Sequence, residues 1–184
     1  MAVLISMLRG VNLGAHNRIP MDALRSVYES LKLEEPRTYV QSGNIIFRTK
    51  EKDLAKLALK IQDAIQKKFK CRPDVLLRTT DDLKKAVSAT PFAGRSGLEP
   101  GKILVTFLAA PPSAEAEANL AKFKDYPEEL HLKGRELYIY FPNGAGRSKL
   151  PWSSVEKLLG VTGTARNWNS VRKMLEMAEE MERP

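Results

Sequence analysis

The densest group of side chains that could bind a ligand lies near the C-terminus. Arg166 provides a planar fork of hydrogen-bond donors, Asn167 and Asn169 provide amides, and Trp168 provides a large flat ring. In one interpretation a strand ends and a helix begins here, with Asn167 or Asn169 as N-cap and Trp168 as a core anchor. In the other, the donors and the helix N-terminus bind an anion together. From this stretch alone the first interpretation is favoured, because caps and buried tryptophans are far commoner than ligand sites.

Three further stretches share the same composition of Gly, Asn, Ser and Arg, namely residues 9–18, 41–44 and 143–149. Glycine lets backbone N–H groups approach a ligand, and arginine and lysine then suit phosphate. Neither the Walker A spacing nor G-x-G-x-x-G is present, so no standard nucleotide motif applies. The candidate ligand-binding residues are Arg9, Asn12, Gln41, Ser42, Asn44, Arg147, Ser148, Lys149, Arg166, Asn167, Trp168 and Asn169.

Composition sets the class of protein and of partner. With 43% hydrophobic and 28% charged residues, the chain has the make-up of a globular protein. A net charge of +8 favours acidic partners, such as nucleotides, nucleic acid or phosphorylated metabolites. A single cysteine, Cys71, excludes an internal disulfide and a thiolate metal cluster, and we expect no metal site. No apolar run is long enough for a membrane span, so we expect a cytoplasmic protein without a membrane partner.

The elements that must position these stretches follow a repeated order. In the first half, apolar patterns predict strands over 3–8, 38–40, 45–47 and 75–77. Helical spacing predicts one helix opened by Ile19-Pro20 and reaching Leu31, and another over 52–69. Pro36 is expected to break the chain, and Gln41 to Asn44 to form a hairpin turn. The order β-α-β-β-α-β is that of the split βαβ, or ferredoxin-like, plait.

The second half repeats this order after a linking helix over 79–89. Strands are predicted over 103–108, 129–132, 137–141 and 161–166, and helices over 113–124, capped by Ser113, and 153–159. A final helix is predicted over 169–181. The expected fold class is therefore α+β, with two tandem ferredoxin-like (βαββαβ) subdomains and a C-terminal helix. The subdomains are expected at 1–89 and 102–184, with residues 90–101, the richest in turn residues, as linker.

Four motifs, in order, resemble the domain of unknown function 1697 family over nearly the whole chain. They are Leu8-Arg9-Gly10-Val11-Asn12-Leu13-Gly14, Tyr39-Val40-Gln41-Ser42-Gly43-Asn44-Ile45-Ile46-Phe47, Gly146-Arg147-Ser148-Lys149-Leu150 and Arg166-Asn167-Trp168-Asn169-Ser170-Val171. The resemblance implies a mainly bacterial protein with two plait-like subdomains. It supplies no established activity, and the cofactor stays unknown.

We therefore expect an anionic or phosphorylated ligand, bound in a basic cleft between the subdomains. Arg9, Arg147, Lys149 and Arg166 would meet its charge, and Trp168 would stack on it or close the wall. Three alternatives stay open: nucleic-acid binding over an extended basic face, an enzyme acting on a phosphorylated small molecule with His16 in the chemistry, and motifs that only fix the fold. A steep dependence on salt distinguishes nucleic-acid binding.

Overall fold

The computed structural model describes residues 1–14 and 17–183, so His16 lies outside the described residues. Packing divides the chain into two compact units, which we call unit 1 (residues 1–84 and 173–184) and unit 2 (residues 85–172). Each unit contains a four-stranded antiparallel sheet. This confirms the predicted α+β class. The predicted subdomains at 1–89 and 102–184, with a linker at 90–101, stay a prediction.

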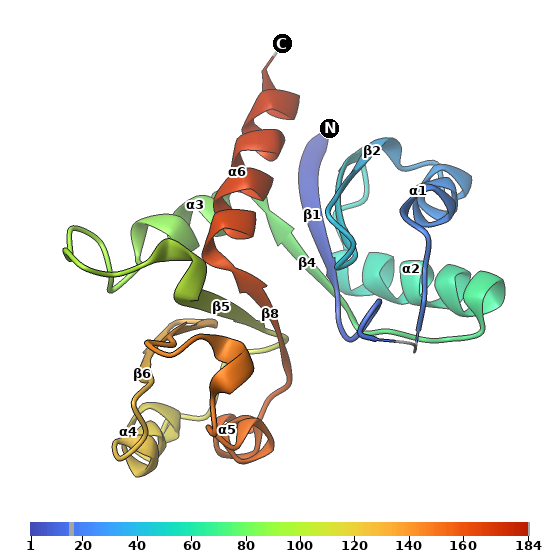
Figure 1. Ribbon diagram of the computed structural model, residues 1–184. Helices are drawn as coiled ribbons and strands as arrows, with labels where there is room; N and C mark the ends of the chain where they lie inside the picture. Colours follow the sequence, from blue (N-terminus) through green and yellow to red (C-terminus); the bar gives the residue numbers. More distant parts are fainter. Residues whose placement is uncertain (15–16, 184) are drawn as a thin grey trace. The chain divides into compact units, whose positions relative to one another are not determined.

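Unit 1 begins with a β-α-β-β-α-β segment (Figure 1). Its strands have the spatial order β2-β3-β1-β4. The bounds are β1 Ala2–Leu8, α1 Met21–Ser30, β2 Glu34–Tyr39, β3 Asn44–Thr49, α2 Leu54–Phe69 and β4 Val75–Thr79. Most of these elements differ in length by a few residues from the ranges that the sequence patterns predict.

The core of unit 1 lies between one face of its sheet and helices α1 and α2. Leu4, Ile45 and Phe47 from the strands pack with Leu24 and Ile61 from the helices, and all five are buried. The apolar positions of α1 and α2 recur at helical spacing, which is why one side of each helix is buried. Asp53 begins α2 as its N-cap, because its carboxylate accepts from the Lys56 N–H.

The expectation that Pro36 breaks the chain before the second strand is wrong. Pro36 lies inside β2, which starts at Glu34. β2 is an edge strand of the sheet, and its register against β3 shifts between Glu34 and Arg37. Glu35 has a φ of 50°, as expected at such a bulge. An edge strand with a bulge tolerates proline because no ladder hydrogen bond needs its missing N–H.

Unit 2 repeats the strand order of unit 1, as β6-β7-β5-β8. The bounds are β5 Ile103–Leu108, α4 Ala116–Leu120, β6 Glu129–Lys133, β7 Glu136–Tyr140, α5 Trp152–Leu159 and β8 Gly163–Asn167. Short 3-10 turns lie at Pro100–Lys102 (η1), Ala121–Phe123 (η2) and Ala145–Arg147 (η3). Gly160 ends α5 in the left-handed conformation that glycine favours.

The helix predicted over 113–124 is shorter in the structure. It begins at Ala116 after Glu115, not after a Ser113 cap, and its last turn is the 3-10 turn η2. Ala116, Leu120 and Phe123 recur at i, i+4 and i+7, and all three are buried in the core of unit 2. The alanine-rich sequence favoured a longer regular helix, and this spacing does not explain why the last turn is a 3-10 turn.

Helices α3 (Thr80–Ser88) and α6 (Trp168–Glu182) contain the unit boundaries. In unit 1, Arg48 donates to the Met181 carbonyl of α6, and Lys84 lies near the carboxylates of Glu179 and Glu182. In unit 2, the Tyr138 hydroxyl donates to the Ala86 carbonyl of α3 at 2.6 Å. Among the described residues, every helix is too short or too polar to span a bilayer.

Candidate functional site

Two of the four polar stretches meet in unit 1, at the end of β1. Met7 is paired with Asn44 at the start of β3, and the Leu8 N–H donates to the Gly43 carbonyl at 2.9 Å. Gly43 packs so closely that an added Cβ would lie 2.7 Å from Val11 and 2.8 Å from Leu8. The segments 9–14 and 41–44, far apart in sequence, therefore lie side by side.

Asn12 joins these two segments through its side chain. Its amide nitrogen donates to the carbonyls of Gln41 (2.6 Å) and Ile19 (3.0 Å), and its amide oxygen accepts from the Ile19 N–H (2.7 Å). A side-chain amide offers two N–H donors, so both donors of Asn12 are occupied. Asn12 holds the loop together with the same groups that we predicted for a ligand.

Asn44 has a similar place in the turn between β2 and β3. It is fully buried, and its amide nitrogen donates to the Tyr39 carbonyl and the Ser42 hydroxyl. Arg9 is half-exposed, and its guanidinium lies 3.6 Å from the Asp74 carboxylate. An exposed ion pair of this length contributes little to stability. Ligand contacts by Arg9, Ser42 and Asn44 stay a prediction.

Beside this cluster unit 1 has an open hollow of about 330 Å³. Its lining includes the predicted residues Asn12 and Gln41 and, in addition, the exposed Arg18. The sequence placed Arg18 in a polar stretch but gave no reason to select it. Only the fold shows that Arg18 borders the hollow, together with Gly14, Ile19 and Pro20.

The other two polar stretches meet in unit 2, at the start of β5. Ile103 is paired with Tyr140, the end of β7, and Leu104 with Asn167, the end of β8. Asn167 donates through its amide nitrogen to the Gly101 carbonyl at 2.8 Å, which holds η1 beside the end of β8. The loop 141–149 leaves the same end of the sheet, because the Phe141 N–H donates to the Lys102 carbonyl.

Basic side chains gather at this end of unit 2. Arg147 and Lys149 are exposed, and in residues 1–14 and 17–183 neither has an ion-pair partner. Lys102 donates to the Glu99 carboxylate at 2.7 Å, which raises the pKa of Lys102, whereas the positive charge of Arg147 opposes that rise. Ser148 is part of the turn, since its hydroxyl accepts from the Leu150 N–H. The sequence did not identify Lys102, because it lies in another stretch.

Arg166 is buried, unlike Arg147. Its guanidinium donates to the Thr164 hydroxyl at 2.7 Å and to the Ala165 carbonyl at 2.8 Å. Burial lowers the pKa of Arg166 to about 10, because removal from water disfavours the charged form. These contacts give Arg166 a structural role in β8.

The strand β8 runs directly into α6 at Asn167 and Trp168. The Asn169 N–H donates to the Asn167 side-chain oxygen at 3.0 Å, as an N-cap does. Trp168 is half-buried at the first position of α6, and Asn169 is exposed. Asn167 therefore acts as the N-cap, as the first interpretation of this stretch predicts. A ligand contact by Trp168 or Asn169 stays a prediction.

The predicted residues thus form two groups, one at the end of β1 in unit 1 and one at the start of β5 in unit 2. The shared cleft expected from the sequence stays a prediction. A further hollow in unit 2, between α4 and β6, contains none of the predicted residues. No group of three or more His, Cys, Asp or Glu side chains in the described residues is arranged to hold a metal ion.

These features define a mixed α+β protein built from two four-stranded antiparallel sheets with polar loops at their ends. The chain belongs to the family described as protein of unknown function (DUF1697), whose model matches residues 1–138. Its structure is similar to that of a conserved bacterial protein, SP0830, from Streptococcus pneumoniae, with a TM-score of 0.67 and 21% identity over 96% of this chain and 98% of that one. Comparison with curated proteins gives no match.

Proposed function

We propose that this protein binds a phosphate-bearing ligand at the basic end of unit 2, formed by Lys102, Arg147, Lys149 and Asn167. The proposal includes a bacterial, cytoplasmic setting and two ferredoxin-like plaits as the scaffold. One observation carries this proposal. The start of β5 pairs with the ends of both β7 and β8, which brings loop 141–149 and Asn167 to the same end of the sheet.

The charges at this end support an anion as the ligand. Arg147 and Lys149 have no carboxylate partner in the described residues, so both are available to an anion without loss of an ion pair, whereas Lys102 would share its charge between the anion and Glu99. Arginine can bind two phosphate oxygens at once, and lysine adds a mobile point charge. Arg147 also acts electrostatically on Lys102, and a phosphate placed between these cations would relieve their mutual repulsion.

The backbone at the basic end leaves room for the same ligand. Gly144 has a φ of 83°, and the turn η3 follows it directly. Gly146 has open space beside it, so a ligand could approach the chain there without meeting a side chain. Asn167 contributes indirectly, since its bond to Gly101 fixes the segment that carries Lys102.

The test compares two arginine variants in unit 2. Arg147→Gln removes a charge at the basic end, and Arg135→Gln removes one in the turn between β6 and β7, beside the end of β5. Binding of ATP and of inorganic phosphate is measured by calorimetry for both variants and the wild type. We expect Arg147→Gln to weaken ATP binding about tenfold, the loss typical of a charge-assisted contact, and Arg135→Gln to leave it unchanged.

Equal affinities of all three proteins for ATP would contradict the proposal. The same titration with a single-stranded oligonucleotide separates the nucleic-acid alternative. If the oligonucleotide binds more tightly than ATP, and its affinity falls steeply with salt, the basic end is part of a nucleic-acid surface instead. A small phosphate ligand at this site would show a shallow dependence on salt.

A further inference from the structure

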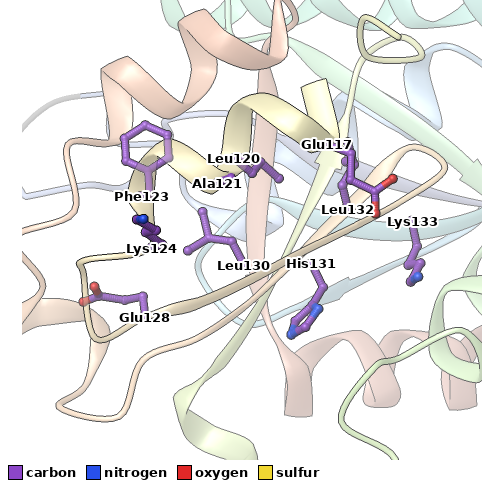
Figure 2. A pocket seen from close by; sticks show the side chains of 10 residues that line it. All are labelled: Glu117, Leu120, Ala121, Phe123, Lys124, Glu128, Leu130, His131, Leu132 and Lys133. Atoms are coloured by element: carbon purple, nitrogen blue, oxygen red, sulfur yellow. The ribbon is translucent and has the colours of Figure 1, made fainter. Parts of the chain in front are cut away.

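Unit 2 contains a groove between its edge strand β6 and the helical segment α4–η2. Figure 2 shows the side chains that line this hollow of about 310 Å³, with those of the helical segment on one side and those of β6 on the other. Its apolar residues are Leu120, Ala121 and Phe123 from the helical side and Leu130 and Leu132 from the strand. Leu130 and Leu132 are only half-buried, so the groove has an open apolar wall.

One buried carboxylate distinguishes this groove from an ordinary surface furrow. Glu128, which lines the groove just before β6, is 7% exposed, and its Oε2 atom has no hydrogen-bond partner within the described residues. A carboxylate oxygen that is removed from water without a partner costs free energy, which a cation or an N–H donor at that oxygen would recover. Lys124 and Lys133 also line the groove, but both are exposed to water.

The strand beside the groove has an available edge. In the described residues β6 pairs with β7 alone, in an unbroken register from Glu129–Tyr140 to Lys133–Glu136. Alternate N–H and C=O groups of an edge strand point away from the sheet and can pair with another extended chain. The corresponding edge strand of unit 1, β2, has Pro36 and a bulge, both of which discourage such pairing. The β6 strand has neither.

We propose that this groove binds an extended peptide segment that carries a lysine or arginine. The segment would pair with the edge of β6, set apolar side chains against Leu120, Phe123 and Leu130, and place its basic side chain at Glu128. Strand addition of this kind takes affinity from main-chain hydrogen bonds and specificity from side-chain pockets. The basic side chain follows from charge complementarity, because Glu128 is the buried charge and the lysines are solvated.

The test is a selection from a displayed library of short random peptides on the full-length protein, repeated on Glu128→Gln. We expect the wild type to enrich peptides in which a lysine or arginine alternates with apolar residues. A synthetic peptide of the enriched sequence should bind Glu128→Gln at least about tenfold more weakly, as expected when one partner of a buried charge pair is removed. Peptide binding should also slow amide hydrogen exchange in β6, and Glu128→Gln should melt no lower than the wild type.

Other outcomes would overturn the proposal. Enrichment of acidic peptides would show that Lys124 and Lys133, and not Glu128, select the charge of the peptide. Binding that is equal for wild type and Glu128→Gln would exclude the contact between the basic side chain and Glu128. Binding that leaves exchange in β6 unchanged would exclude pairing at this edge. Failure to enrich any sequence would show that the groove binds no peptide, and a concentration-dependent dimer that protects β6 would identify a second copy of the chain as the occupant.

Discussion

The two units use one strand order in two different ways. In unit 1 two backbone hydrogen bonds lie at the end of the first strand, β1. The Leu8 N–H donates to the Gly43 carbonyl, and the Arg9 N–H donates to the Asp74 carbonyl. In unit 2 the first strand, β5, is bonded in the same manner by the Arg135 and Thr162 carbonyls, which accept from Leu108 and Ala109. The backbones correspond at these positions, yet the polar stretches lie at the end of β1 in one unit and at the start of β5 in the other.

This difference separates loops that stabilise themselves from loops that present charge. At the end of β1 the amides of Asn12 and Asn44 bond to neighbouring backbone and to Ser42. At the start of β5 Arg147 and Lys149 are exposed, while Ser148, Arg166 and Asn167 bond to the backbone. Amides therefore hold the loops in both units, whereas the exposed cations of the unit 2 loop are the groups that we propose for an anion.

The largest effect that would test this comparison is expected at Gly43. Gly43→Ala places a Cβ within 2.7 Å of Val11 at a φ of 74°, so we expect unfolding to become easier by about 3 kcal/mol, the sum of steric overlap and backbone strain. Gly10→Ala is the matched control: it has a similar φ of 69° but open space, and we expect a loss of about 1 kcal/mol. Chemical denaturation measures both, and equal losses would show that the close packing of the two loops contributes nothing.

A smaller effect is expected when a loop amide is removed in each unit. Asn12→Ala deletes three hydrogen bonds that join residues 12, 19 and 41, and we expect a loss of about 2 kcal/mol in the free energy of unfolding. Asn143→Ala, at an exposed position in loop 141–149, should change it by less than about 0.5 kcal/mol. If Asn12→Ala were as stable as the wild type, the self-stabilised character of the unit 1 loops would be disproved.

The smallest effect concerns the edge strand β6. Arg95 forms two hydrogen bonds with Glu129, at 2.7 and 3.0 Å, and thereby lowers the pKa of that carboxyl. A carboxyl whose pKa is lowered by folding stabilises the protein above its ordinary pKa and loses that contribution as pH falls through the folded value. Arg95→Gln should thus melt slightly below the wild type at neutral pH, and the difference should shrink as pH falls below the ordinary pKa of glutamate and vanish below the lowered pKa of Glu129.

Both side chains of this pair are about two-fifths exposed, so solvent screening keeps the effect small. The corresponding pair at the edge of unit 1, Arg37 and Glu35, is longer at 3.3 Å. Arg37→Gln is the matched variant, and we expect a still smaller change in its melting temperature at neutral pH. A larger change for Arg37→Gln than for Arg95→Gln would reverse this ranking of the two edges.

Much of the fold follows from periodic patterns in the sequence. The run from Ile103 to Leu108 is a strand with the predicted bounds, and the helical stripe ending at Gly160 is α5. The patterns failed where a single residue decides between two local structures. Pro36 is compatible with β2 because that strand is at an edge, and the helix predicted over 113–124 loses its regular winding after Leu120, where η2 begins. Neither edge position nor burial is a local property of the chain.

The candidate site divides in the same manner. Composition selected Asn12, Asn44 and Arg166 as donors, but it could not show that their donors are used within the fold. It also missed Lys102 and Glu128, since a lysine in a turn and a glutamate beside a strand are ordinary in sequence. Lys102 became a candidate because the charge of Arg147 acts on it, and Glu128 because it is buried.

The sequence by itself determined the order of strands and helices, because apolar spacing between near neighbours in the chain decides between helix and strand. It also showed directly which residue types the polar loops contain. Only the tertiary structure decided which donors are already occupied, which cations face solvent and which strand edge is open. Those properties depend on pairs such as Asn12 with Gln41, Asn167 with Gly101 and β5 with β8, which are remote in sequence and are brought together only when the sheets form.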